Sequence, residues 1–218
     1  MITLDTEIAG ETMRLDHRRA LVWPRQRWLL IADLHLGKAS LMRQSGAALP
    51  RGTTTSDLAR LSALIAEHTP QRLLVLGDLV HGNEQKEADW LATLARWRNA
   101  HPTLELTLIA GNHDRHMSLH ALGFDVLTHL DAEPFHLAHV PGTHATLHVL
   151  AGHLHPAATL RDARLRHRLP AFWIGPQRTV LPAFGALTGL APIAAAANDR
   201  VYALTPGGVL ALGTRGHR

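Results

Sequence analysis

Short apolar runs alternate with amphipathic stretches along the first half of the chain. Runs at 20–23 and 28–31 predict two short strands, and residues 54–68 place leucine and isoleucine at helical spacing. The run at 73–76 is compact and wholly apolar, as in a buried strand. Residues 84–99 repeat the helical spacing, with tryptophan and leucine on one side. This alternation of strands and helices predicts an α/β core.

The second half of the chain continues with strand-like segments and more frequent turns. Residues 104–109, 135–139 and 148–151 read as short strands, and residues 164–169 alternate between polar and apolar side chains. Glycine and proline punctuate the rest, which predicts hairpins that complete the sheets. A length of 218 residues without repeats or linkers predicts one domain over 1–218. In such α/β folds, chemistry collects in the loops beyond the carboxyl ends of the strands.

The composition is that of a packed globular protein, with 46% hydrophobic and 18% charged residues. Cysteine is absent, so any metal must be held by nitrogen and oxygen ligands, and seventeen histidines are available. A net charge of +4 permits an anionic partner. The N-terminus lacks the apolar segment of a secretory signal, and the apolar stretch 186–197 is too short to cross a membrane. We therefore expect a cytoplasmic protein without a membrane span.

Polar motifs follow the predicted strands at five places. They are Asp33-Leu34-His35, Gly77-Asp78-Leu79-Val80-His81, Gly111-Asn112-His113-Asp114, His139 and Gly152-His153-Leu154-His155. Residues two apart on an extended segment point the same way, so the Asp-x-His and His-x-His pairs are each expected to converge on one ion. A glycine directly before Asp78, Asn112 and His153 lets the backbone approach an ion or a phosphate closely.

The donors in these motifs are carboxylate, amide oxygen and imidazole, which suit manganese, iron or zinc. They are numerous enough for two ions. Two ions about 3.5–4 Å apart can share a carboxylate and a hydroxide, and can stabilise both oxygens of an in-line displacement at phosphorus. The motifs therefore predict phosphoryl-transfer chemistry.

The ordered set of motifs resembles the calcineurin-like metallophosphoesterase superfamily over residues 33–155. Short strings at 169–173 (LPAFW) and 180–185 (VLPAFG) resemble the ligase-associated DNA damage response endonuclease branch of that superfamily. The resemblance implies a four-layer α/β fold, in which two mixed β-sheets pack face to face and are flanked by helices. It also implies two divalent metal ions, with manganese favoured and iron or zinc as alternatives.

The same resemblance implies a role for each motif residue. The first ion would be bound by Asp33, His35 and His155, the second by Asn112, His139 and His153, with Asp78 bridging both. His113 would be catalytic, contacting the phosphate and protonating the leaving oxygen, and His81 would lie close to the scissile phosphate. Lys38 and Arg115 follow metal motifs and are candidates for binding substrate phosphate, with solvent-facing charge as the alternative.

The function implied is a DNA endonuclease of a repair pathway, working by direct attack of a metal-bridging hydroxide on phosphorus. Its implied partners are single-stranded DNA and, functionally, a DNA ligase, a helicase and an exonuclease. The alternatives are a phosphatase or a phosphodiesterase acting on cyclic nucleotides or nucleotide sugars, and a non-catalytic repair scaffold. A metal-dependent amidohydrolase is disfavoured, because it does not explain the GD and GNHD segments.

Two assignments stay open at this stage. The endonuclease branch tends to have an acidic residue after its lone histidine, whereas Val140 follows His139 here, so His136, His144 or His148 are alternative ligands. We favour His139 because it ends an apolar segment, as the other ligands do. The basic stretch formed by Arg161, Arg164, Arg166 and Arg168 either tracks a nucleic-acid backbone or is the solvated face of a hairpin.

Overall fold

The computed structural model describes residues 2–50, 52–81, 88–114, 119–161 and 166–213. Its first sheet has the order β1-β2-β3-β4-β5-β6-β7, so neighbours in space are neighbours along the chain. The strands are β1 (Thr3–Ile8), β2 (Glu11–Asp16), β3 (Ala20–Trp23), β4 (Trp28–Ala32), β5 (Arg72–Leu76), β6 (Glu105–Ile109) and β7 (Phe124–Leu127). Strands β1 to β4 pair antiparallel, and β4 to β7 pair parallel. The parallel half therefore brings the carboxyl ends of β4, β5 and β6 to one edge.

The second sheet has the order β14-β11-β12-β13-β10-β9-β8, with β15 pairing β12 and β16. Its strands are β8 (Leu130–Ala132), β9 (Phe135–Ala138), β10 (His148–Ala151), β11 (Pro156–Arg161), β12 (Arg166–Ile174), β13 (Arg178–Val180), β14 (Ala191–Pro192), β15 (Arg200–Thr205) and β16 (Gly208–Leu212). Strands β9, β10 and β13 are parallel, so β9 and β10 also end at a common edge. The predicted pair of mixed sheets is confirmed.

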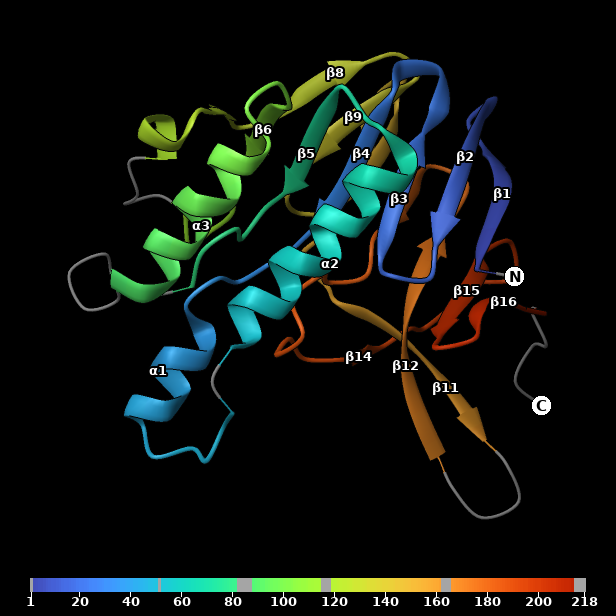
Figure 1. Cartoon of the computed structure of the whole chain (residues 1–218). Helices are drawn as coiled ribbons and strands as arrows, with labels where there is room; N and C mark the ends of the chain where they lie inside the picture. The colour runs from blue at the N-terminus through green and yellow to red at the C-terminus, as the bar shows by residue number, and fades with distance from the viewer. Residues whose placement is uncertain (1, 51, 82–87, 115–118, 162–165, 214–218) are drawn as a thin grey trace.

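Helices cover the first sheet on the side away from the second (Figure 1). This layer consists of α2 (Thr53–His68) and α3 (Ala88–Ala100), whereas α1 (Lys38–Gln44) contributes no residue to the core beneath it. Short 3-10 turns lie at η1 (Pro24–Gln26) and η3 (Leu119–Leu122). The helix predicted over 54–68 is confirmed, and the one predicted over 84–99 is confirmed where the structure describes it. No helix in the described residues is long and apolar enough to span a bilayer.

The apolar run at the end of β4 shows why these strands lack polar alternation. Leu29 and Ile31 pack against α2 and α3, whereas Leu30 and Ala32 pack into the core between the sheets. In that inner core, Trp23 of the first sheet meets Phe135 of the second edge to face, with ring centroids 4.8 Å apart. Both faces of β4 are therefore buried, as in parallel sheets generally.

The outer face of the second sheet carries a smaller apolar cluster. It includes Ala158, Ala171 and Ala203, with Ile193 of the loop after β14 packed against it. All three described α-helices lie between residues 38 and 100. The helical layer therefore belongs to the first sheet, and a loop packs on the second.

Candidate metal centre

The predicted ligands gather where the carboxyl ends of both sheets meet. Asp33 directly follows β4, and His139 directly follows β9 of the other sheet. Hydrogen bonds interlock the loops: His35 N–H donates to the Asp78 carbonyl at 2.9 Å, and His153 N–H donates to Asp33 Oδ2 at 2.7 Å. The sheet packing thus holds segments together that are more than 100 residues apart.

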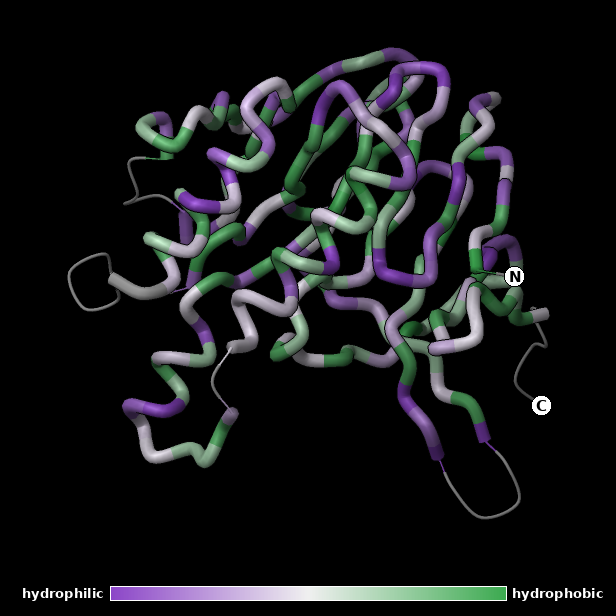
Figure 2. Tube along the Cα trace, in the orientation of Figure 1, coloured by the Kyte–Doolittle hydropathy of each residue, from purple (hydrophilic) through white to green (hydrophobic). Residues whose placement is uncertain are grey.

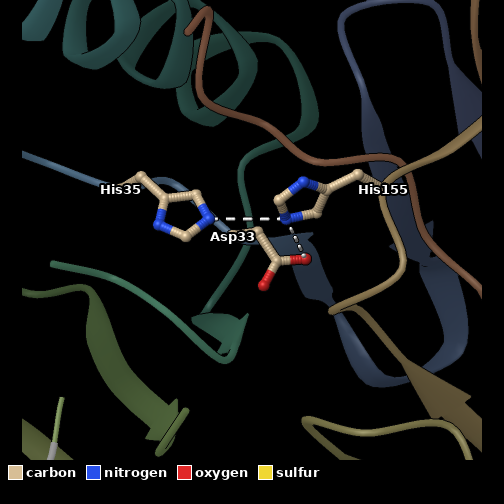
Figure 3. Close-up of side chains that lie close together, drawn as sticks. All are labelled: Asp33, His35 and His155. Atoms are coloured by element: carbon tan, nitrogen blue, oxygen red, sulfur yellow. Dashed lines mark hydrogen bonds and ion pairs between the residues drawn. The ribbon is translucent and has the colours of Figure 1, made fainter. Parts of the chain in front are cut away.

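A first cluster consists of Asp33, His35 and His155 (Figure 3). The Nε2 atoms of the two histidines lie 3.4 Å apart, and His155 Nε2 lies 3.6 Å from Asp33 Oδ2. Both imidazoles turn toward the carboxylate in the close-up. Three donors from two distant motifs therefore face one small volume.

A second cluster consists of Asp78, His139 and His153. His139 Nε2 lies 3.0 Å from His153 Nδ1 and 3.8 Å from Asp78 Oδ2. The same Asp78 oxygen lies 4.0 Å from His35 Nε2 of the first cluster. One carboxylate oxygen thus sits between the two groups, where a shared ligand has to be.

The 3.0, 3.4 and 3.6 Å spacings within the clusters fit divalent cations, and the two distances from Asp78 Oδ2, 3.8 and 4.0 Å, are slightly longer. Two ligands each about 2.0–2.2 Å from one ion lie roughly 3–3.6 Å from each other at ordinary coordination angles. Asp33 Oδ1 is buried without a hydrogen-bond partner, and it is one of only four such side-chain atoms in the described residues. Leaving polar atoms unpaired in the interior costs free energy. The residues present therefore fit a bound metal.

The pKa shifts of the histidines and of Asp33 also fit a bound metal. Burial lowers the pKa of His35 to about 3 and that of His155 to about 4, and it also lowers the pKa of His139. These imidazoles are neutral at pH 7, with lone pairs available for coordination. Burial, with the nearby charges of Asp78 and Asp114, raises the pKa of Asp33 well above its usual range. A buried carboxylate in this position is stabilised by a cation.

The backbone at the ligands is not extended. Asp33 and His35 have φ values of 50°, Asp78 has 35°, His153 has 68° and His155 has 49°, all in the left-handed region. The prediction that paired ligands converge because their segments are extended is therefore wrong. They converge because each loop turns through a conformation that costs about 1–3 kcal/mol per residue and that cross-loop hydrogen bonds maintain.

Three of the motif glycines make room for a ligand from another loop, and a Cβ at Gly152 would lie 2.6 Å from Asp33 Oδ2. A Cβ at Gly77 would lie 1.7 Å from His139 Nδ1, and one at Gly111 would lie 2.2 Å from Asp78 Oδ1. The expected approach of the backbone to an ion or a phosphate stays a prediction. The close neighbour is a ligand side chain, which only a residue without Cβ can accommodate.

The two candidate catalytic histidines lie beside the clusters. The ring centroids of His81 and His113 are 4.2 Å apart, and His81 Nδ1 lies 3.3 Å from His35 Nδ1. His113 is exposed, and its backbone N–H donates to Asp78 Oδ1 at 3.1 Å. Asn112 precedes it on the same loop and is also exposed. This pair of imidazoles borders the first cluster on its open side.

The candidate substrate-binding residues have different outcomes. Lys38 begins α1 and lines a small pocket together with His35, Thr53 and Asp57. Its positive charge adds to burial in lowering the pKa of His155. Arg115 lies outside the described residues. The positively charged side chain of Lys38 thus lies beside the first cluster.

The structure brings His139 to the clusters, and it places its alternatives elsewhere. His136 Nδ1 lies 2.5 Å from Asp131 Oδ1, and His148 Nε2 pairs with Thr179 Oγ1 at 2.9 Å. His144 Nδ1 accepts hydrogen bonds from the backbone of residues 146 and 147. The geometry therefore favours His139 as the fourth-motif ligand.

Two further groups of histidine and carboxylate in the described residues are held together by contacts within the protein. Asp16, Glu67 and His68 are joined by Arg18, whose Nη2 lies 2.6 Å from both carboxylates, so a cation is already present. The group of Asp131, His136 and His144 is more exposed, and the lone pair of His144 Nδ1 is occupied by backbone N–H groups. Neither group therefore resembles the two clusters at the sheet edge.

Asp114 is a functional candidate that the sequence analysis did not single out. It is 4% exposed; Oδ1 accepts from Val80 N–H at 3.0 Å and Oδ2 accepts from Gly111 N–H at 2.8 Å. It therefore ties the loop of Asp78 to the loop of His113. Its position as the last residue of the GNHD motif is the sequence feature that could have indicated this role.

Two half-buried arginines, Arg19 and Arg60, support the backbone next to the site. Arg19 Nη1 donates to the carbonyls of Ala183 at 3.2 Å and Gly185 at 3.0 Å, and Arg60 Nη2 donates to the Phe184 carbonyl. Gly185 N–H in turn donates to the Asp33 carbonyl at 3.2 Å. The segment that matches VLPAFG thus supports the backbone of a metal-ligand candidate.

Comparison with known proteins agrees with this site. Residues 27–168 match the family model for calcineurin-like phosphoesterases. The chain is 39% identical to the Pseudomonas putida nuclease MPE, with a TM-score of 0.85 over 96% of this chain and 100% of that one. This similarity is consistent with the endonuclease branch and extends beyond the family model.

Two weaker structural similarities are to a protein of unknown function from Aquifex aeolicus and to Yfce, a phosphoesterase from E. coli. The first is 16% identical, with a TM-score of 0.40 over 63% of this chain and 81% of that one. The second is 13% identical, with a TM-score of 0.42 over 88% of this chain and 94% of that one. None of the curated proteins matches. From the family match and the 39% identity to a nuclease, the chain belongs to the calcineurin-like phosphoesterase family and is a metal-dependent phosphoester hydrolase.

Proposed function

We propose that this protein is a binuclear phosphodiesterase that cleaves DNA internally in a repair pathway. The observation that carries the binuclear assignment is the position of Asp78 Oδ2, within 4.0 Å of a histidine nitrogen in each cluster. The choice of DNA is supported by 39% identity to a nuclease over nearly the whole chain. The repair role, with a ligase, helicase and exonuclease as functional partners, rests on the strings at 169–173 and 180–185 alone.

In this proposal each cluster holds one divalent ion. Asp33, His35 and His155 hold the first, and His139 and His153 hold the second, while Asp78 is shared. Asn112 joins the second ion on the resemblance alone. When bound, such a pair of ions supplies a hydroxide near neutral pH and neutralises charge on the phosphate. Manganese is the ion we propose on the resemblance to the endonuclease branch, since nitrogen and oxygen donors without thiolate suit manganese, iron and zinc alike.

The protein itself supplies proton transfer and orientation. Burial lowers the pKa of His81, so its imidazole is neutral at pH 7 and suited to accept a hydrogen bond. His113 is exposed beside it, on a loop whose backbone is fixed to Asp78, and is the group placed to protonate the leaving oxygen. Lys38 is placed to contact a phosphate oxygen next to the first cluster.

Incubation with manganese and circular single-stranded DNA tests the proposal. A DNA endonuclease converts the circle to linear product, whereas a phosphatase or a small-molecule phosphodiesterase leaves it intact. Asp78→Ala should abolish both this cleavage and hydrolysis of bis-p-nitrophenyl phosphate, while the chain stays folded. Asp131→Ala, which removes an exposed carboxylate from a group outside the two clusters, is the matched control and should retain both activities.

Intact circles together with hydrolysis of bis-p-nitrophenyl phosphate would replace the nuclease assignment with a small-molecule phosphodiesterase. Retained turnover in Asp78→Ala would refute the binuclear centre itself.

A further inference from the structure

The hairpin of β11 and β12 leaves the body of the protein directly after the metal-ligand candidates. Pro156, the first residue of β11, follows His155, and β12 returns antiparallel beside it. Figure 1 shows the outer part of both strands projecting from the two packed sheets. The hairpin is therefore an arm whose base is the first cluster.

The register of the arm places its three described arginines on one face, and Arg164 of the predicted basic stretch lies outside the described residues. Arg161 lies directly opposite Arg166, and Arg168 lies opposite Thr159. Residues directly opposite in a ladder, and residues two apart in a strand, share a face. Arg161, Arg166 and Arg168 therefore form one basic face with Thr159, whereas Leu160 and Leu169 belong to the other face. Figure 2 shows the outer ends of both strands as hydrophilic.

This face differs from other arginine positions on the sheets. On the first sheet, Arg14 is opposite Asp5 and Arg72 is opposite Glu105, and both pairs form ion pairs, at 2.7 Å and 2.5 Å. On the arm, two arginines oppose each other, an arrangement that destabilises a sheet. All three are exposed, and the described residues of the arm, 156–161 and 166–174, contain no acid. The described part of the protein thus leaves three positive charges on this face uncompensated.

We infer that the face of Arg161, Arg166 and Arg168 binds the sugar–phosphate backbone of the nucleic acid being cut. The inference rests on the proposed function, and it adds a binding site outside the metal centre. Arginine matches phosphate oxygens with paired donors, and contacts of this kind fix a strand without reading its sequence. Thr159 on the same face adds a hydroxyl donor.

The length of the arm sets the size of the substrate it engages. Arg161 is the sixth residue after His155, and six steps at about 3.3 Å per residue span roughly 20 Å. At about 3.4 Å per phosphate along one strand of a duplex, this distance corresponds to about six phosphates. DNA that extends beyond this length from the scissile bond reaches the arm, and shorter DNA does not.

The test compares the wild type with the triple variant Arg161→Gln, Arg166→Gln, Arg168→Gln. In the triple variant, hydrolysis of bis-p-nitrophenyl phosphate should be unchanged, because that substrate is too small to reach the arm. The kcat/KM for long oligonucleotides should fall, and its logarithmic dependence on salt should become less steep by about 2–3, at about 0.7–0.9 per lost contact. The advantage of long over short oligonucleotides should disappear.

Single variants provide a matched control for charge. Arg166→Gln should reduce the salt slope by about 0.7–0.9, whereas Arg96→Gln, which removes one exposed positive charge from α3, should not. A triple variant that cleaves long DNA with the wild-type rate and salt slope would overturn the inference. The inference would also be overturned if the triple variant changed its oligomeric state, measured by sedimentation, and kept the wild-type salt slope. That result would make the face a contact between protein molecules. A wild type that hydrolyses bis-p-nitrophenyl phosphate and is inert on all DNA would overturn the proposed function and the arm together.

Discussion

The backbone N–H of His153 donates a 2.7 Å hydrogen bond to Oδ2 of Asp33, across 120 residues of sequence. It joins the loop after β4 in one sheet to the loop after β10 in the other. Asp33 is fully buried, so this bond also fixes how the two sheets meet at the site. Substitution of Asp33 therefore changes the fold as well as metal binding, and the sharpest variants are those that separate the two effects.

Gly77→Ala should damage the centre without removing any ligand. The new Cβ would lie 1.7 Å from His139 Nδ1, so the imidazole must move, and a displacement of about 1 Å can cost about 100-fold in rate. Phosphodiester hydrolysis and bound manganese, measured on the same sample, should both fall.

Gly10→Ala is the matched control. Gly10 has φ +83°, nearly the +82° of Gly77, but no atom lies within 4 Å of its added Cβ. Backbone strain in Gly10→Ala should lower the free energy of unfolding by about 1–2 kcal/mol, and activity should stay intact. Equal losses of activity in the two variants would show that strain, and not the space for His139, explains the effect.

Much of this site was predictable because its signals are local. The apolar runs that form β4 and β5 are followed by the motifs of Asp33 and Asp78. The residue types in these motifs are themselves common metal ligands, so the candidates could be identified from them. The left-handed backbone was not predictable, because a partner loop maintains it: His35 N–H bonds to the Asp78 carbonyl. A sequence pattern of period two describes extended chain and contains no information on that bond.

Other features were missed because their partners are distant or their burial is small. Arg19 acts through carbonyls more than 160 residues away, and nothing near it in sequence indicates those contacts. Helix α1 buries Ala39 alone, so it carries no apolar stripe from which to predict it. The role of Asp114 depends on two backbone N–H groups that only the folded loops bring together.

Asp114→Asn should weaken metal binding although Asp114 is not among the metal-ligand candidates. Both oxygens of Asp114 accept hydrogen bonds from backbone N–H groups. The amide of asparagine replaces one acceptor by a donor, so one of the hydrogen bonds that join the loops of Asp78 and His113 is lost. Loss of such supporting contacts costs about 10–100-fold in metal affinity. Titration of the metal-free protein with manganese measures the change.

Asp199→Asn serves as the control for that variant. Asp199 is also buried and accepts from Trp173 Nε1 and Ala196 N–H, but it lies on the loop beside the outer face of the second sheet. The Asp199→Asn variant should have a lower free energy of unfolding and an unchanged affinity for manganese. If both variants lose affinity alike, general destabilisation is the cause and Asp114 has no special role.

Asp16→Asn should lower stability at neutral pH and lose this effect in acid. Burial alone would raise the pKa of Asp16, but hydrogen bonds from Arg18 and His68 outweigh it and hold the pKa below its usual range. The stabilisation by the carboxylate is therefore complete above the unfolded pKa of about 3.9, and it is lost as pH falls through the lower folded value. We expect a difference of about 1–3 kcal/mol at pH 7.

Urea unfolding of wild type and Asp16→Asn over a series of pH values checks this. The difference between the two proteins isolates Asp16 from every other titrating group. A difference that grows as pH falls below about 4 has the wrong sign and would contradict the network.

His113→Ala should retain its metal and lose activity in a way that depends on the leaving group. His113 lies outside both clusters, so manganese content should match the wild type, whereas His153→Ala should lose metal. A general acid contributes about 10²–10⁴-fold when the leaving oxygen needs a proton, as the alkoxide of DNA does. p-Nitrophenolate leaves readily without one, so hydrolysis of bis-p-nitrophenyl phosphate should fall much less than DNA cleavage. Equal losses on the two substrates would mean that His113 binds the phosphate instead of protonating the leaving oxygen, because only proton donation distinguishes one leaving group from the other.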